Sequence, residues 1–259
     1  MDAFDVHAHL NLAAFEDDLD AVLGRADEAG VSRILCVGVD LETSRRAVEL
    51  AQRYPDRILA AVGIHPNHWA DSADEMDAVA ELAADLHVAA IGETGLDFYH
   101  EHTPRDAQVD GFRWHLSLAR AVSKPIIVHA RRSDDEVLRI LSDEASPAGG
   151  VRHCFDRPWE TAKSYFERGF HISLAAAVTR PGYKKLKAAV ARMPGDRLLV
   201  ETDCPYQSPA SRSGERNEPA FITETIEAAA ALRDQTPDEF AALTTANARA
   251  LFLPDRRDG

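Results

Sequence analysis

Residues 4–9 read FDVHAH and predict a short buried strand that ends on two histidines. Side chains alternate between the two faces of a strand, so His7 and His9 point to the same side. They lie one pleat repeat apart, roughly 6.5 Å along the strand, so both imidazoles can converge on one ion. A His-x-His pair at a strand end indicates a metal site, although two core or surface histidines also occur at this spacing by chance.

Further along the chain, apolar runs of strand length alternate with helical patterns. The runs cover residues 33–39, 58–64, 88–91, 126–128, 151–152, 170–174 and 198–200. Helices are expected at residues 12–29, 43–54, 74–85, 108–122, 134–141, 159–168, 184–192 and 221–232, and a last helix from Thr236. Strands that are apolar on both faces are typical of parallel sheets covered by helices. Eight such units in 259 residues predict an α/β chain folded as a (β/α)8 TIM barrel.

The main alternative is an open, doubly wound sheet, which normally carries a glycine-rich phosphate loop after its first strand. Here the corresponding turn, residues 8–12, contains no glycine. No linker or low-complexity segment interrupts the alternation, so residues 1–259 are predicted to form a single domain. At its C-terminal end, Thr236, Pro237 and Glu239 predict the capping box of the last helix.

Composition limits the location and the partners of the protein. The apolar runs are shorter than the about 20 residues of a membrane span, and no signal-peptide pattern opens the chain. Three cysteines without a Cys-x-x-Cys pair suit a reducing compartment, so a cytoplasmic location is expected, with Cys154 and Cys204 buried and facing away from any site. The net charge of −14 repels nucleic acid at long range, so a polyanionic substrate requires local basic groups.

Six residues of metal-ligand type stand at the carboxyl ends of predicted strands: His7, His9, Glu93, His129, His153 and Asp203. Each has a structural explanation when taken alone, for example a core histidine for His129 or a helix cap for Glu93. In a barrel, however, these strand ends share one rim, so the set predicts a metal centre. Imidazole together with carboxylate suits zinc, manganese or iron better than magnesium, and a carboxylate such as Glu93 can bridge two ions.

The motifs around these residues resemble those of the TatD-type metal-dependent deoxyribonucleases, a branch of the amidohydrolase-like barrels. They are DVHAH (5–9), GIHP (63–66), IGETGLD (91–97), PIIVHAR (125–131), HCF (153–155), ETDCPY (201–206) and RNEP (216–219), and they run over essentially the whole chain. The resemblance implies two divalent metal ions (Zn, Mn or Mg). One would be held by His7, His9, Glu93 and Asp203, and the other by Glu93, His129 and His153.

The resemblance also implies hydrolysis of phosphodiester bonds in DNA, often by trimming single-stranded DNA or ends, with no obligate protein partner evident. Two ions can activate a water and stabilise the attacking and leaving oxygens. Asp203 and Glu93 are the catalytic candidates, and Asp203 is expected to orient the water and take its proton. The candidates for binding substrate phosphates are His65, Arg131 and Arg157. Glu201, one layer deeper than Asp203, is expected to support a ligand.

Three departures from the family pattern concern the substrate more than the metals. Asn67 stands where the family usually has a histidine, Asp156 and Arg157 follow HCF in place of a small hydroxyl residue and glycine, and Gln207 replaces an apolar residue. They leave open a hydrolase of the same superfamily that acts on a small ester, lactone, amide or phosphoester. A third alternative is a barrel that has lost catalysis and serves as a binding partner.

Overall fold

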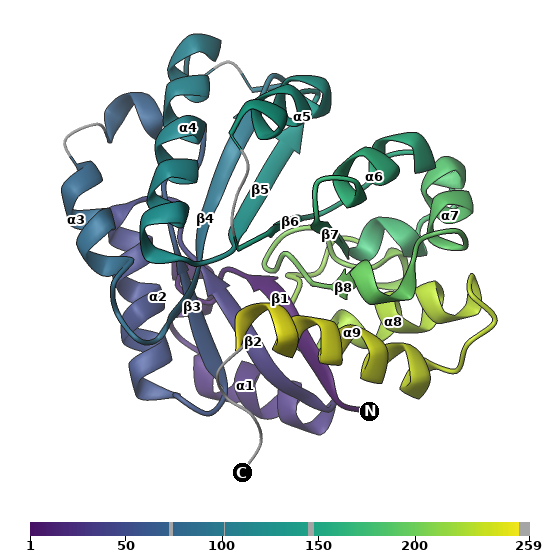
Figure 1. The fold of residues 1–259 in the computed structure, drawn as a ribbon. Coiled ribbons are helices and arrows are strands. Elements are labelled where there is room, and N and C mark those ends of the chain that lie inside the picture. Colours follow the sequence, from purple (N-terminus) through teal and green to yellow (C-terminus); the bar gives the residue numbers. More distant parts are fainter. Residues whose placement is uncertain (73–74, 101, 145–147, 254–259) are drawn as a thin grey trace.

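Eight parallel strands form the centre of the computed structural model, which describes residues 1–72, 75–100, 102–144 and 148–253 (Figure 1). They are β1 (Ala3–Ala8), β2 (Val31–Val37), β3 (Ile58–Val62), β4 (Val88–Asp97), β5 (Ile126–Arg131), β6 (Gly150–Arg152), β7 (Phe170–Leu174) and β8 (Leu198–Val200), paired in this order. Beyond β8, the backbone amide of His9 donates to the carbonyl oxygen of Cys204 at 2.8 Å. The amide of Asp203 donates to the carbonyl oxygen of His7 at 2.9 Å. These bonds join the last strand to the first, and the predicted (β/α)8 barrel is confirmed.

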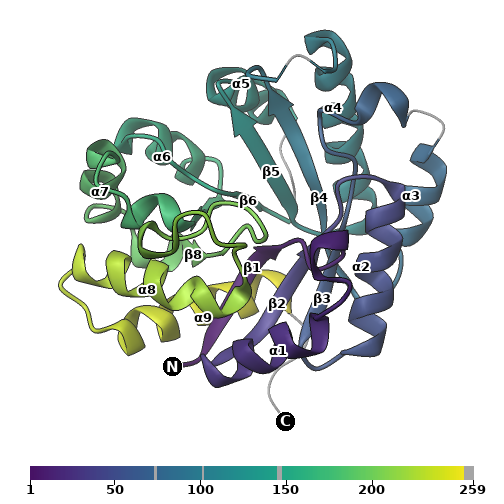
Figure 2. The same ribbon diagram turned by 180° about the vertical axis from the view of Figure 1, so that it is seen from behind.

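Helices surround the strands on the outside, as the two opposite views show (Figures 1 and 2). They are α1 (Leu19–Glu28), α2 (Leu41–Arg53), α3 (Met76–Leu82), α4 (Arg105–Val122), α5 (Asp134–Asp143), α6 (Trp159–Phe166), α7 (Lys184–Val190), α8 (Ile222–Ala231) and α9 (Pro237–Phe252). Short 3-10 turns lie at Ala13–Phe15, Trp69–Asp71, Ala176–Thr179, Gly195–Arg197, Ala210–Arg212 and Pro219–Phe221. Within the described ranges, no helix is long and apolar enough to cross a bilayer.

The last helix, α9, covers the amino-terminal end of the barrel. Thr236 accepts from the amide of Glu239, and the Glu239 carboxylate accepts from the amide of Thr236, so the predicted capping box is confirmed. Phe252 packs on Phe4 with ring centroids 6.0 Å apart and joins an apolar cluster that includes residues from seven strands. The opposite, carboxyl end of the strands, here called the mouth, is therefore left for the functional groups.

Two segments differ from the sequence expectation. The first helix begins at Leu19 rather than at residue 12, because the Arg216 guanidinium lies over the Phe15 ring and pairs with Asp18 at 2.7 Å. These contacts hold residues 13–18 as a 3-10 turn and a short loop, against the local helical pattern.

The fourth strand does not end at residue 91 but continues to Asp97. Gly92 and Gly95 have φ values of +139° and +130°, which only glycine adopts readily. A Cβ at Gly95 would lie 2.1 Å from the carbonyl oxygen of His129. The two glycines thus let β4 run close beside β5 up to the mouth. This places Glu93 and Asp97 next to His129.

Candidate metal centre

A cavity of about 660 Å³ opens at the mouth, and all but one of the six predicted ligands line it. The exception, His7, is fully buried just beneath it. Each of these side chains comes from the carboxyl-terminal half of a strand or from the first three residues after it, which is where a parallel barrel collects its functional groups. The fold therefore gathers into one site six side chains that are spread over nearly 200 residues of sequence.

Glu93 lies between two groups of imidazoles. Its Oε2 atom is 3.4 Å from His7 Nε2 and 3.6 Å from His9 Nε2. Its Oε1 atom is 2.9 Å from both His129 Nδ1 and His153 Nε2. Ligand atoms of one tetrahedral zinc ion lie roughly 3.4 Å apart, given bonds of about 2.1 Å. The carboxylate thus has one oxygen for each of two neighbouring metal positions.

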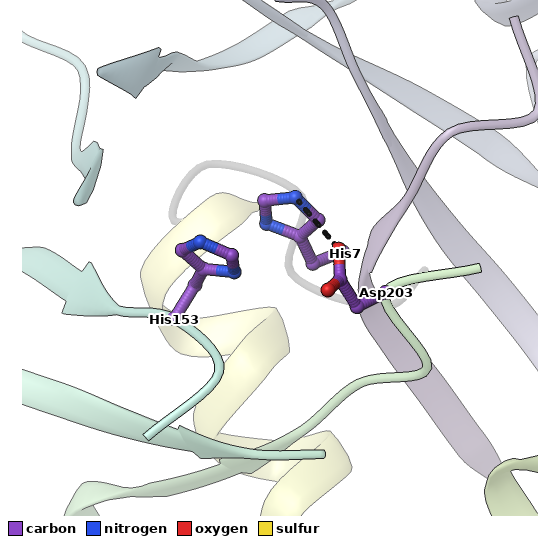
Figure 3. Close-up of side chains that lie close together, drawn as sticks. All are labelled: His7, His153 and Asp203. Atoms are coloured by element: carbon purple, nitrogen blue, oxygen red, sulfur yellow. Dashed lines mark ion pairs between the residues drawn. The ribbon is translucent and has the colours of Figure 1, made fainter. Parts of the chain in front are cut away.

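Asp203 completes the side of the site formed by β1. Its Oδ1 atom is 3.8 Å from His7 Nε2 and 3.5 Å from His9 Nε2, while its Oδ2 accepts a hydrogen bond of 2.8 Å from Gln207 Nε2. His153 approaches from β6 and stacks its ring on His7, with centroids 4.1 Å apart (Figure 3). Within the described part of the chain, His7, His153 and Asp203 are one of three groups whose ligand atoms lie within 4.8 Å of one another.

Hydrogen bonds at the far side of two rings favour the tautomer that a metal ligand needs. His9 Nδ1 lies 2.9 Å from the carbonyl oxygen of Val37, an acceptor only, so Nδ1 carries the proton and Nε2 presents its lone pair to the site. His129 Nε2 lies 3.3 Å from Asp97 Oδ2, which leaves Nδ1 to face Glu93 and His153. Such outer partners orient metal-binding histidines in proteins.

The charges of the cluster also fit a cation. Burial raises the pKa of Glu93, but the surrounding imidazoles, His153 first, outweigh it and hold that pKa well below its usual range. Burial lowers the pKa of His153, yet Glu93 and then Glu201 raise it to about 10. A carboxylate oxygen and an imidazole nitrogen 2.9 Å apart need a hydrogen or a metal ion between them, because their lone pairs otherwise repel. The residues present therefore fit divalent metal ions.

His65 is as close to Glu93 as a ligand would be, but its hydrogen bonds favour another role. Its Nε2 lies 3.6 Å from Glu93 Oε1, and it forms one of the candidate groups with Glu93 and His129. The amide of Asn67 donates to His65 Nδ1 at 3.1 Å, so the proton is on Nε2. Burial lowers the pKa of His65 to about 3 and keeps the ring neutral. His65 therefore presents an N–H donor to the cavity.

Asp97 is a functional candidate that the sequence interpretation missed. Besides His129, it accepts hydrogen bonds from His100 Nδ1 and from the amides of Tyr99 and His100, all at 2.9 Å. Burial raises the pKa of Asp97, but these bonds together lower it below its usual range. The residue is the last one of the IGETGLD motif. Its role could not be inferred because the expected strand ended six residues earlier.

Three other predicted residues lie on the cavity wall or behind it. Arg131 and Arg157 line the cavity, but Arg131 lies over the Tyr99 ring at 4.2 Å and Arg157 donates to Asp134 at 2.9 Å. Glu201 is buried behind His153, with Oε1 3.4 Å from Nδ1. Cys204 is buried as expected. For Cys154 the expectation is wrong, because it lines the cavity next to Gln207.

Comparisons with known proteins agree with this geometry. The model of a family described as TatD related DNase matches residues 4–253. The chain is 42% identical to the uncharacterized metal-dependent hydrolase YabD of Bacillus subtilis, over 96% of this chain and 98% of the relative. It is 35% identical to the 3'-5' ssDNA/RNA exonuclease TatD of Erwinia amylovora, over 96% of this chain and 99% of that relative. The solved structure of the TatD homologue YJJV of Escherichia coli K12 superposes with a TM-score of 0.90 at 29% identity, covering 96% of this chain and 97% of that one.

Proposed function

Because the chain belongs to the TatD-related DNase family, and is thus a metal-dependent hydrolase, we propose that it cleaves phosphodiester bonds of single-stranded DNA from an end. The observation that carries the proposal is the position of the Glu93 carboxylate, with one oxygen facing His7 and His9 and the other facing His129 and His153. The name of the Erwinia relative supports single strands as substrate and adds RNA as a second one to test.

Two divalent ions are proposed to bind, one at His7, His9, Glu93 and Asp203, and the other at Glu93, His129 and His153. When bound, such ions lower the pKa of a coordinated water and neutralise the charge that develops on phosphate oxygens. Zinc, manganese and magnesium are the candidates, and the imidazole-rich donor set favours the first two.

The side chains around the ions divide the remaining work. Asp203 is ionised, because the imidazoles of His9 and His7 outweigh the effect of burial and lower its pKa. It can therefore accept a proton from the attacking water, while Gln207 fixes the direction of its carboxylate through Oδ2. The Nε2–H group of His65 donates a hydrogen bond to a non-bridging phosphate oxygen, and Arg131 and Arg157 attract the phosphate backbone from the cavity wall.

An activity screen with defined metals tests the proposal. The metal-free protein is loaded with Mg²⁺, Mn²⁺ or Zn²⁺ and incubated with end-labelled single-stranded DNA, duplex DNA, single-stranded RNA and a panel of small esters and lactones. We expect stepwise shortening of the single strands with at least one metal. Turnover of a small ester without any cleavage of nucleic acid would instead support the hydrolase of small substrates that Asp156, Arg157 and Gln207 leave open.

A further inference from the structure

Exposed tyrosines gather around the mouth. Among the described residues, the large apolar or aromatic side chains classed as exposed are Met1, Leu86, Tyr99, Tyr183 and Tyr206. The three tyrosines all follow carboxyl ends of strands, those of β4, β7 and β8, whereas Leu86 lies in the loop before β4 at the other end of the barrel. An aromatic ring left in water at an active-site rim is a contact surface, because burying it releases free energy that the fold itself has not used.

Two of these rings line the cavity itself. Tyr183 precedes α7 and Tyr206 follows the ETD segment that carries Asp203. Tyr206 is 54% exposed and stands edge-to-face to His9, with ring centroids 5.9 Å apart. A flat group that rests on Tyr206 is therefore next to the predicted metal ligands, within the length of about one nucleotide.

Positive charge lies on the adjoining arc of the rim, after β5 and β6. The Arg131 guanidinium rests on the Tyr99 ring, with Arg132 at 4.5 Å from the same ring, and Arg131 has no ion pair with a carboxylate in the described part of the chain. Arg157 is held by Asp134 and shares its charge with Asp156 at 3.4 Å. The rim thus presents aromatic rings on one arc and guanidinium groups on the next, with the metal ligands as the floor.

We propose that Tyr183 and Tyr206 are a stacking subsite for unpaired nucleobases, and that Arg131 binds the backbone phosphate beside them. The inference rests on the proposed function and names the part of the substrate that this subsite binds. Stacking on aromatic side chains is tolerant of base identity, since every base offers a flat face. A base within a duplex is already paired and stacked, so the tyrosines select a frayed or single-stranded end.

The subsite also accounts for a nuclease with a net charge of −14. Charge-driven binding over a whole protein surface is weak for such a chain and falls further with salt. Stacking is far less sensitive to salt than phosphate contacts are, so the tyrosines retain the end of a strand where the surface repels the remainder. The few arginines of the rim then need to hold only the nearest phosphates.

The test compares two oligonucleotides that share every phosphate and sugar, one of normal sequence and one whose terminal nucleotides lack their bases. For the wild type we expect kcat/KM to be roughly 5- to 100-fold higher with the bases present. Tyr183→Ser and Tyr206→Ser should each reduce this ratio several-fold, with the rate on the abasic strand little changed. Tyr206→Phe should retain the ratio, since the ring remains, and Leu86→Ser is a control for loss of an exposed apolar side chain elsewhere.

Two further measurements keep the outcomes separate. Metal analysis of each variant shows whether the Tyr206 change disturbs His9. If it does, Tyr183→Ser is the deciding variant, because Tyr183 has no ring contact or hydrogen bond with a predicted ligand among the described residues. Fluorescence anisotropy with the metal-free protein compares the binding affinities for the normal and abasic strands without cleavage. The role of the tyrosines can therefore be tested even if the protein is not a nuclease. Equal affinity and equal rates for the normal and abasic strands would overturn the proposal.

Discussion

Asp97 Oδ2 lies 3.3 Å from Nε2 of His129, whose other ring nitrogen lies 2.9 Å from Glu93. The carboxylate therefore orients the ring of a predicted ligand from behind, as outer-shell carboxylates do in metal sites. The backbone amides of Tyr99 and His100 hold Asp97 in turn. This short chain of contacts connects the end of β4 to the centre of the site.

Asp97→Asn should weaken metal binding and slow cleavage by about 10- to 100-fold, because the neutral amide holds the His129 ring less firmly. Competition with a coloured chelator measures the affinity, and initial rates at saturating metal measure the second effect. Circular dichroism should show an unchanged fold. Wild-type metal affinity in this variant would show that Asp97 does not act through His129.

His129→Ala should abolish metal-dependent cleavage without unfolding the barrel, because it removes one predicted ligand of one ion. The metal-free variant should lose no more than about 3 kcal/mol of unfolding free energy, as for ordinary point changes. His87→Ala is the matched control, since His87 pairs with Asp85 in the loop before β4, away from the mouth. Wild-type rates at equal metal occupancy would exclude His129 as a ligand.

Glu93→Gln should remove more metal than Asp97→Asn or His129→Ala, because the charge of this carboxylate faces both groups of histidines. Metal analysis by mass spectrometry should find fewer ions per chain than in His129→Ala, which leaves the β1 side intact. The rate should fall by more than the roughly 100-fold upper value for an outer-shell residue. If both variants keep the same number of ions as the wild type, the bridging role of Glu93 is wrong.

Arg152→Met should destabilise the folded chain by about 3–5 kcal/mol, because it leaves Asp134 buried without its main partner. Arg152 is 2% exposed, pairs with Asp134 at 3.0 Å and donates to the carbonyl oxygens of Ala130 and His153. Adding Asp134→Leu should recover part of the loss. Urea unfolding of the two single variants and the double variant measures the coupling energy between Arg152 and Asp134. Additive losses of unfolding free energy would show that the two residues are not coupled.

His115 should make the stability of the protein depend on pH. It is buried, accepts from the amide of Ile64 at 2.9 Å, and burial lowers its pKa from 6.5 to about 4. Since the unfolded chain binds the proton more readily, the contribution of neutral, buried His115 to the unfolding free energy is complete above pH 6.5 and is lost as the pH falls towards 4. The loss amounts to about 3 kcal/mol at 1.36 kcal/mol per pH unit.

The measurement is the unfolding free energy of metal-free wild type and His115→Gln between pH 4 and pH 8. Other histidines titrate in both proteins, so their effects largely cancel in the difference. The wild type should lose more stability than the variant as the pH falls from 6.5 to 4. Parallel curves would show that His115 is protonated as easily in the folded chain as in the unfolded one.

The barrel and the set of side chains at its mouth could be predicted from the amino-acid pattern alone. Eight apolar runs alternate with helical patterns, and parallel strands connected by helices must all end on the same side. Residues as far apart as His7 and Asp203 could therefore be assigned to one rim without coordinates. The capping box at Thr236 was equally predictable, because its two hydrogen bonds join residues three positions apart.

How each of these groups is used depends on contacts that form only in the folded chain. His65 presents a donor because the amide of Asn67 occupies its other nitrogen, and His129 is oriented by Asp97 because two glycines let β4 extend beside β5. Cys154, Tyr183 and Tyr206 line the cavity through loop conformations that no periodic pattern encodes. A tautomer, a side-chain direction or an exposed ring depends on partners brought near by the whole fold, and local sequence carries no record of those partners.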